Sequence, residues 1–173
     1  MALAVAGSAA GRDRWTEQQA NAWYATMPWL VGCNYNPASA INQLEMWQAE
    51  TFDADGIDRE LGWAEALGFT SMRVFLHDLP WKQDPKGFGD RIDRFLAIAD
   101  RHRIGVMFVF LDACWDPHPK AGPQRAPRPH VHNSGWVQCP GAEIIGHPNR
   151  HDEMQGYRSE EHTSELQSRQ SIS

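Results

Sequence analysis

The sequence lacks most of the signals that mark membrane-spanning, nucleotide-binding and nucleic-acid-binding proteins. No apolar run approaches the roughly 18 residues that a membrane span needs. The net charge is -6, but no block of like charge occurs, so we expect neither nucleic acid nor a membrane as a partner. The patterns GxGxxG, GxxxxGK[ST] and GxSxG are also absent, so the sequence predicts no nucleotide cofactor and no serine hydrolase chemistry.

Cysteine is scarce, and its three residues fit neither a CxxC metal pair nor a dense disulfide scaffold. They are Cys33, Cys114 and Cys139. An odd count leaves at least one thiol unpaired or paired with another chain. The sequence does not determine the oligomeric state. Because Cys114 and Cys139 fall in one long predicted loop, a bridge between them and free thiols are both open alternatives.

Histidine is more frequent, but its residues form no recognised metal-binding pattern. His118, His130 and His132 are spaced by twelve and by two residues in a proline-rich segment, without a helical HxxxH or a cysteine pair. We therefore expect unpaired loop histidines and no metal site.

Composition divides the chain into three parts. Residues 1–13 are apolar and end in small residues, like the remnant of a secretory signal without its basic start; this predicts a secreted or periplasmic protein, with a plain N-terminus as the alternative. Residues 14–157 contain all eight tryptophans and predict a folded domain. Residues 158–173 contain no aromatic residue and are rich in serine and glutamate, so we expect a disordered tail there.

Three short apolar segments, residues 28–35, 71–76 and 106–111, have the composition of buried strands. The third, VMFVFL, is apolar without alternation, which is typical of a strand covered on both faces. Helical periodicity separates the three segments. The order strand, helix, strand, helix, strand predicts an α/β fold with parallel strands and right-handed crossovers.

The two helices between these strands have start signals, stop signals and apolar stripes. The first helix begins after Asp53 and ends at Gly68, and its apolar stripe is Ile57, Leu61, Ala64 and Leu67. Asp84 and Pro85 begin the second, whose stripe is Ile92, Phe95, Leu96 and Ala99. Asp13 is expected to cap a further helix near the N-terminus.

The links between these elements differ in length. The helix-to-strand links have about three residues, whereas the strand-to-helix links span residues 36–52, 77–84 and 112 to at least 140. The long links contain half of the tryptophans, namely Trp47, Trp81, Trp115 and Trp136. In a barrel of alternating strands and helices, the loops after the strands build the active-site face. We therefore expect the functional residues in these long links.

Four segments resemble the amino-terminal part of secreted, cellulase-like glycoside hydrolases of the large retaining clan with a (β/α)8 barrel. They are GCNYNPASAINQLEMWQAETFD, GFTSMRVFLHDLPW, VMFVFLDACWDP and VHNSGWVQCPG, within residues 14–141. The resemblance implies a partial TIM barrel of about the first three β/α units and a β-linked plant-type polysaccharide as substrate. Many clan members have a histidine near the exit of the third strand, where this sequence reads Asp112, Ala113 and Cys114, so the particular polysaccharide stays open.

The two catalytic glutamates of that family belong to later segments, and the acid/base residue follows an asparagine. The printed sequence contains no Asn-Glu pair, so no catalytic residue is assigned and we expect the chain to be inactive by itself. RSEEHTSELQS, residues 158–168, resembles a translated sequencing adapter, which implies that the reading frame left the gene near Tyr157; a natural tail is the alternative. A non-catalytic carbohydrate-binding protein is the alternative function, although such modules are usually β-sandwiches.

Arg73 is the first candidate for active-site support. It lies inside an apolar strand, and a buried guanidinium requires a charged partner. The resemblance implies that this partner is the nucleophile, which a nearby cation keeps ionised. A structural ion pair with Asp78 or Glu45 is the alternative.

The remaining candidates are aromatic or polar side chains at strand exits and in the third long link. Trp115 and Trp136 could stack on the apolar face of a sugar ring, or could instead act as lids over the core. Five further side chains could donate or accept hydrogen bonds with sugar hydroxyls: Asn34, His77, Asp78, His132 and Asn133.

Overall fold

The computed structural model describes residues 15–158. The expected signal remnant and, except for Arg158, the expected tail therefore lie outside the described residues. The chain forms two units, Met1–Leu30 and Val31–Ser173, which are described separately. Within the described range, no helix is both long and apolar enough to cross a membrane.

The described part of the first unit contains one helix, α1, Glu17–Ala25. A capping box starts it: the Thr16 hydroxyl accepts from the Gln19 backbone N–H at 3.2 Å, and the Gln19 side chain accepts from the Thr16 backbone N–H at 2.9 Å. The cap is therefore Thr16, whereas the sequence predicted Asp13, which lies outside the described residues. No residue of α1 is buried.

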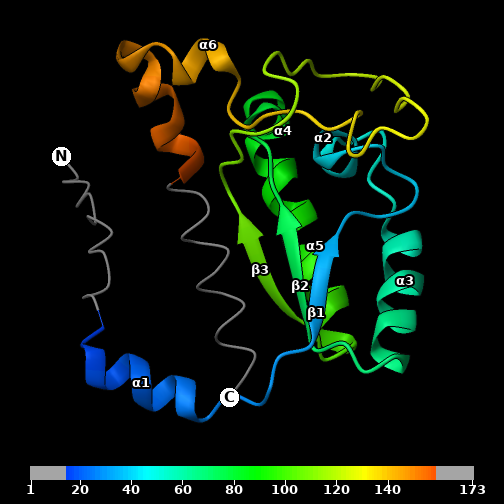
Figure 1. The fold of residues 1–173 in the computed structure, drawn as a ribbon, viewed down its shortest axis with the longest axis vertical. Helices are drawn as coiled ribbons and strands as arrows, with labels where there is room; N and C mark the ends of the chain where they lie inside the picture. The colour runs from blue at the N-terminus through cyan, green and yellow to red at the C-terminus, as the bar shows by residue number, and fades with distance from the viewer. Residues whose placement is uncertain (1–14, 159–173) are drawn as a thin grey trace, which may run out of the picture. The chain divides into compact units, whose positions relative to one another are not determined.

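The second unit is built on a three-stranded parallel sheet with the order β1-β2-β3 (Figure 1). Its strands are β1, Gly32–Tyr35, β2, Ser71–Phe75, and β3, Gly105–Val109. The predicted α/β class with parallel strands is confirmed. All three strands are shorter than the predicted segments.

The two main helices are α3, Ala54–Ala66, and α5, Pro85–Arg101. Both predicted N-caps are confirmed, because the Asp53 and Asp84 carboxylates each accept a backbone N–H of the first turn at 2.9 Å. Gly68 ends α3 with a φ of 87°, a backbone conformation that glycine adopts without steric cost. The helices contact each other, and Figure 1 shows α5 behind the sheet.

The core lies between the sheet and these helices. Its buried side chains include Ile57, Leu61, Met72, Val74, Ile92 and Phe95. Trp47 is fully buried at its centre, where the indole N–H donates to the Phe75 carbonyl at 2.8 Å. The sequence placed Trp47 in a loop on the active-site face, and the structure corrects this to the core.

Short helices lie within the first two long strand-to-helix links and after the third. They are α2, Gln43–Trp47, α4, Asp78–Gln83, α6, Ala142–Ile145, and the 3-10 helix η1, Pro148–Met154. The link 77–84, expected as a loop, thus contains α4. It begins there because the His77 side chain caps it, accepting the Leu79 backbone N–H at 3.1 Å.

Several apolar residues are more exposed than predicted. The first and third segments were expected to be buried, yet Val31 is 43% exposed and Met107 is 58% exposed. Both lie in or next to the outer strands, which pair on one side only within the described part of the chain. Leu67 is 77% exposed because the stripe of α3 ends at Ala64, one turn earlier.

Candidate functional site

The long loop between β3 and α6 is closed at its base by backbone pairing. Asp112 and Cys139 form an antiparallel bridge, with N–O distances of 2.7 and 2.9 Å. Further along, the Gln138 backbone N–H donates to the Asp116 carbonyl at 2.8 Å. The two contacts hold the loop ends together at the carboxyl end of β3.

Side chains next to α2 hold this loop from the other side. The Asn42 side-chain amide donates to the Gly135 carbonyl at 2.8 Å. The Gln48 side chain accepts from the Gly122 backbone N–H at 2.6 Å and donates to the Gly122 carbonyl at 3.1 Å. Asn42 and Gln48 are buried, so the first strand-to-helix link fixes the position of the third. Figure 1 shows the loop passing beside α2.

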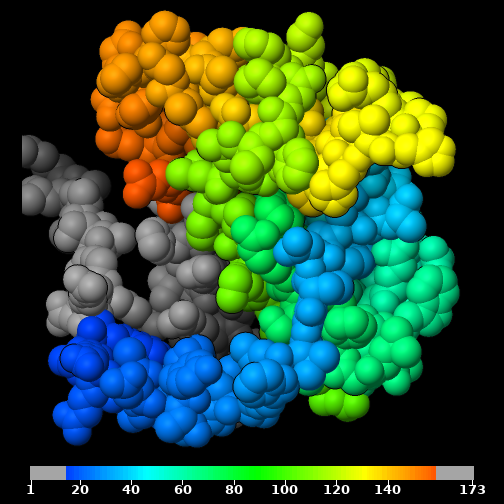
Figure 2. All heavy atoms as spheres, in the orientation of Figure 1, coloured from blue at the N-terminus to red at the C-terminus, as the bar shows by residue number. Residues whose placement is uncertain are grey.

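The loop forms a pocket with a volume of about 450 Å³, which we call the loop pocket. Figure 2 shows the loop, in yellow, at the molecular surface. Four predicted site residues converge here: Trp115, His132, Asn133 and Trp136. The remaining lining residues were not predicted: Asp116, Pro117, Arg125, Arg128, Val131 and Ser134. The proline-rich segment Arg-Ala-Pro-Arg-Pro at 125–129 was the one available signal for the two arginines.

The aromatic rings of the loop pocket form an angled wall. The rings of Trp115 and Trp136 lie 5.9 Å apart at 64°, and the His132 ring lies 5.9 Å from Trp115 at 69°. The Trp115 indole N–H donates to Asp112 at 3.0 Å, and Trp136 packs edge-on against Phe75 at 5.1 Å. Trp115 is 37% exposed, so part of its ring is accessible to a ligand. A lid over the core would also expose one side of its ring, so the lid alternative stays open for both tryptophans.

Arg73 and Asn34 form a separate pair on the open face of the sheet. The Arg73 guanidinium donates to the Asn34 side-chain oxygen at 3.2 Å and lies 4.5 Å from the centre of the Phe75 ring. Arg73 is exposed rather than buried. The two local acids considered as its partners are engaged elsewhere: Glu45 accepts the Ile41 backbone N–H, and Asp78 pairs with Lys82.

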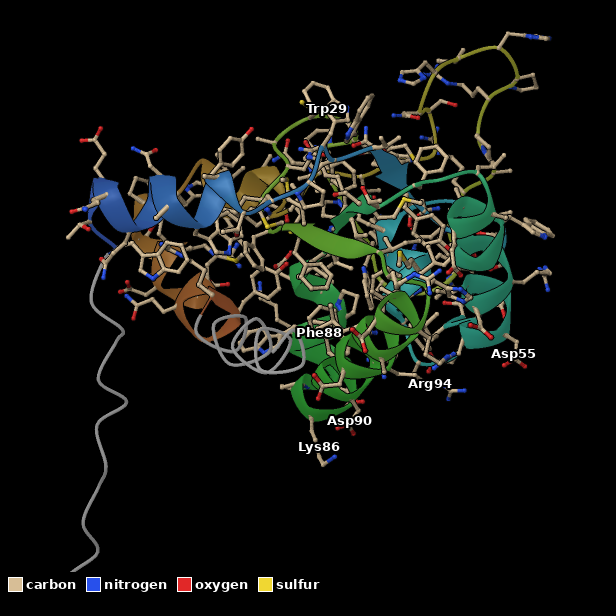
Figure 3. The ribbon with its side chains drawn as sticks, turned by 90° about the horizontal axis from the view of Figure 1, so that it is seen from below. Trp29, Asp55, Lys86, Phe88, Asp90 and Arg94 are labelled. Atoms are coloured by element: carbon tan, nitrogen blue, oxygen red, sulfur yellow. The ribbon has the colours of Figure 1, made fainter. Side chains whose placement is uncertain are left out.

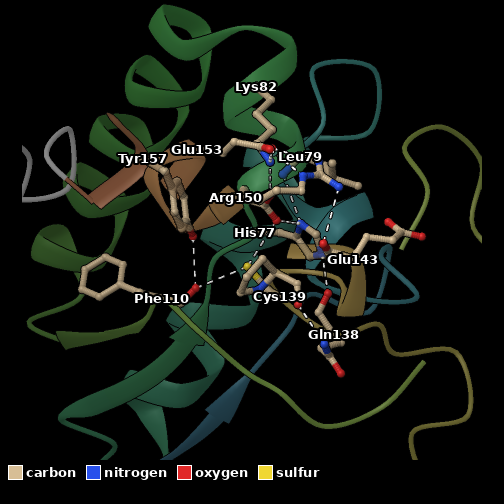
Figure 4. Close-up of polar contacts among 12 residues, drawn as sticks. His77, Leu79, Lys82, Phe110, Gln138, Cys139, Glu143, Arg150, Glu153 and Tyr157 are labelled. Atoms are coloured by element: carbon tan, nitrogen blue, oxygen red, sulfur yellow. Dashed lines mark hydrogen bonds and ion pairs between the residues drawn. The ribbon is translucent and has the colours of Figure 1, made fainter. Parts of the chain in front are cut away.

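His77 and Asp78 belong to a third group, a buried polar network beneath the loop base (Figure 4). His77 contacts the Gln138 carbonyl at 3.0 Å, and Lys82 donates to Asp78 at 2.8 Å. Burial alone would raise the pKa of Asp78, but contacts with His77 and Lys82 outweigh it and lower that pKa to about 2. Asp78 is thus a buried carboxylate held ionised by its neighbours, away from solvent.

Cys139 completes this network and was not predicted to do so. Its thiol lies 3.5 Å from an Asp78 oxygen and 3.4 Å from the Phe110 carbonyl, either of which can accept its proton. Burial, followed by the Asp78 charge, raises the pKa of the thiol. All three cysteines are free, so the alternative Cys114–Cys139 bridge is not formed.

His77, Asp78 and Cys139 are also the one group in the described part of the chain that could hold a metal ion. Their ligand atoms lie within 4.8 Å of one another, and zinc accepts nitrogen, oxygen and sulfur ligands. Each of the three side chains already has a protein partner, so the network is satisfied by hydrogen bonds alone.

The predicted site residues therefore fall into three groups: the loop pocket, the Arg73–Asn34 pair and the buried network around Asp78. Of these groups, the loop pocket alone combines a concave surface, accessible aromatic rings and several polar side chains. Comparison with protein-family models finds no match, and searches of curated proteins and of solved structures also find none.

Proposed function

We propose that the loop pocket binds sugar rings, and that the chain contributes this surface to a retaining glycoside hydrolase acting on β-linked plant-type polysaccharide. The observation that carries the proposal is the angled pair of indoles, Trp115 and Trp136, in one pocket with His132 and Asn133. An accessible indole stacks on the apolar face of a pyranose, while neighbouring polar groups bind its hydroxyls.

The position of the pocket supports the same proposal. In folds of alternating strands and helices, substrates bind beyond the carboxyl ends of parallel strands. The loop pocket follows β3 at that end, and the sequence resembles glycoside hydrolases in these strands and in the loop. The proposal assigns this chain substrate binding and leaves the acid/base and nucleophile roles to glutamates that the printed sequence lacks.

A non-catalytic carbohydrate-binding protein is the second candidate, favoured by the acid content of the pocket. Retention requires two carboxyl groups about 5–5.5 Å apart. Asp116 is the one acid among the residues that line the loop pocket. The source gene separates the two candidates, because the hydrolase requires an in-frame Asn-Glu segment that a binding protein does not.

Binding by the full chain tests the proposal directly. We expect cello-, xylo- or manno-oligosaccharide to change tryptophan fluorescence and to bind in calorimetry, without release of reducing sugar. Trp115→Ala should lower the affinity about fivefold, since ring contacts contribute about 1 kcal/mol. Trp63→Ala is the matched control, because Trp63 is 59% exposed on α3.

Two results would contradict the proposal. If none of the three oligosaccharides binds, the loop pocket is no sugar site. If Trp115→Ala and Trp63→Ala weaken binding equally, the sugar is bound elsewhere. Circular dichroism of each variant separates loss of a contact from loss of fold.

A further inference from the structure

The backbone of the loop pocket is held in an uncommon conformation. Among the described non-glycine residues, four have a positive φ, and three of these belong to this loop: Trp115 at 75°, His130 at 60° and Asn133 at 49°. Such a conformation costs of order 1–3 kcal/mol, most for a bulky side chain, and clusters at ligand sites. Trp115, the bulkiest of the three, lines the pocket.

The charge of the pocket differs from that of the chain. The net charge of the protein is -6, yet the lining contains two arginines, Arg125 and Arg128, against one acid, Asp116. An uncharged sugar does not require this excess of cations. An anionic ligand does, because a cation in a partly enclosed pocket favours it electrostatically.

The two arginines differ in whether their guanidinium groups already have partners. The Arg125 guanidinium donates to the Ser134 carbonyl at 2.9 Å and lies 3.8 Å from an Asp116 oxygen. The Arg128 guanidinium makes no hydrogen bond or ion pair within the described part of the chain. Its backbone N–H donates to the Ser134 hydroxyl at 2.6 Å, which holds the backbone from which the exposed side chain extends.

From this arrangement we infer that the loop pocket selects a sugar carrying a carboxylate, as in a glucuronic-acid-substituted polysaccharide. The ring of the uronic acid stacks on Trp115, and its carboxylate accepts from the Arg128 guanidinium. A planar guanidinium matches the geometry of a carboxylate, which an ammonium does not. The inference rests on the proposed function, because it names the class of sugar that the same pocket takes.

The test compares two ligands that differ in one carboxylate. The first is xylotetraose bearing a single glucuronic acid branch, and the second is the same compound with the carboxyl group reduced to an alcohol. We expect the full chain to bind the acid about fivefold more tightly at low salt, the effect of one partly exposed ion pair. At about 1 M sodium chloride the difference in affinity should vanish, because the Debye length falls to about 3 Å and the ion pair is screened.

Arg128→Gln should lower the affinity for the acid to that of the reduced ligand. Arg94→Gln is the matched control, because it removes the same charge from an exposed arginine of α5 (Figure 3). This variant should keep the fivefold preference for the acidic ligand.

Each remaining outcome overturns a stated part of the inference. Equal affinity of the wild-type chain for both ligands overturns the selection of acidic sugars and leaves the proposed function standing. If the wild-type chain binds neither ligand, the proposed function is overturned as well. A preference that survives in Arg128→Gln, or disappears in Arg94→Gln, overturns the assignment to Arg128.

Discussion

At the scale of single residues, Trp47 organises the core. Its ring contacts four phenylalanine rings, with centroid distances of 5.6 to 6.4 Å: Phe52, Phe88, Phe95 and Phe108. Its indole N–H satisfies the Phe75 carbonyl at the end of β2. Trp47 therefore joins the short helix α2 to both the sheet and α5.

Replacing Trp47 by phenylalanine should destabilise the chain by about 2–4 kcal/mol, because the substitution leaves a small cavity and an unpaired buried carbonyl. The midpoint of urea unfolding measures this change. Trp63→Phe is the control on an exposed position and should change stability by less than about 0.5 kcal/mol. Similar midpoints for the two variants would contradict the central role of Trp47.

At the scale of elements, a cluster of charged groups joins α3 to α5. His102, which caps α5, contacts Glu65 at 2.9 Å and Asp58 at 2.8 Å, both on α3. Arg101 and Arg103 face the same two acids. Hydrogen bonds that Glu65 and Asp58 accept from the ring raise the pKa of His102, and the same bonds are the largest cause that lowers the pKa of each acid.

The cluster predicts a pH dependence of stability. The contribution of charged His102 is fully present below its ordinary pKa of 6.5 and is lost as pH rises through the raised value. The contribution of Asp58 and Glu65 is present above their ordinary values of 3.8 and 4.5 and is lost as pH falls through the lowered ones. The cluster therefore stabilises the fold most between about pH 5 and 6.5.

Thermal melts from pH 6 to 8.5 check this prediction. His102→Gln should lower the melting temperature by up to about 3 °C at the acidic end and by less at the alkaline end. His147→Gln, at an exposed histidine without a side-chain cap contact, should leave the profile unchanged. A His102→Gln effect that is constant with pH would contradict the ionic origin.

The sequence predicted those parts of the fold that depend on residues close together in the chain. Asp53 and Asp84 were identified as caps because a cap needs only the backbone of the next turn. The burial of Trp47 depends on how α2 folds over α5, which periodicity does not encode. In the loop pocket, composition identified the tryptophans. The role that we propose for Arg128 depends on a turn closed by Ser134, six residues away.

At the scale of the whole second unit, one face of the sheet exposes its side chains within the residues that the structure describes. Asn34, Arg73 and Met107 are in register across the three strands, and all three are exposed. Within the described part of the chain, β1 and β3 each pair on one side only. Open edges beside a face that exposes an apolar side chain, here Met107, are a known route to association between chains.

We therefore expect the chain as printed to aggregate, or to melt with poor cooperativity, as its concentration rises. Met107→Lys should delay aggregation in light scattering, because a charge on this face opposes the stacking of a second sheet. Leu67→Lys is the matched control: it adds the same charge at a more exposed apolar residue, the C-cap of α3 rather than a strand of the sheet, and should have little effect. A soluble monomer with a sharp, reversible melt would contradict the expectation, and equal protection by the two lysines would show that net charge, not the open face, controls association.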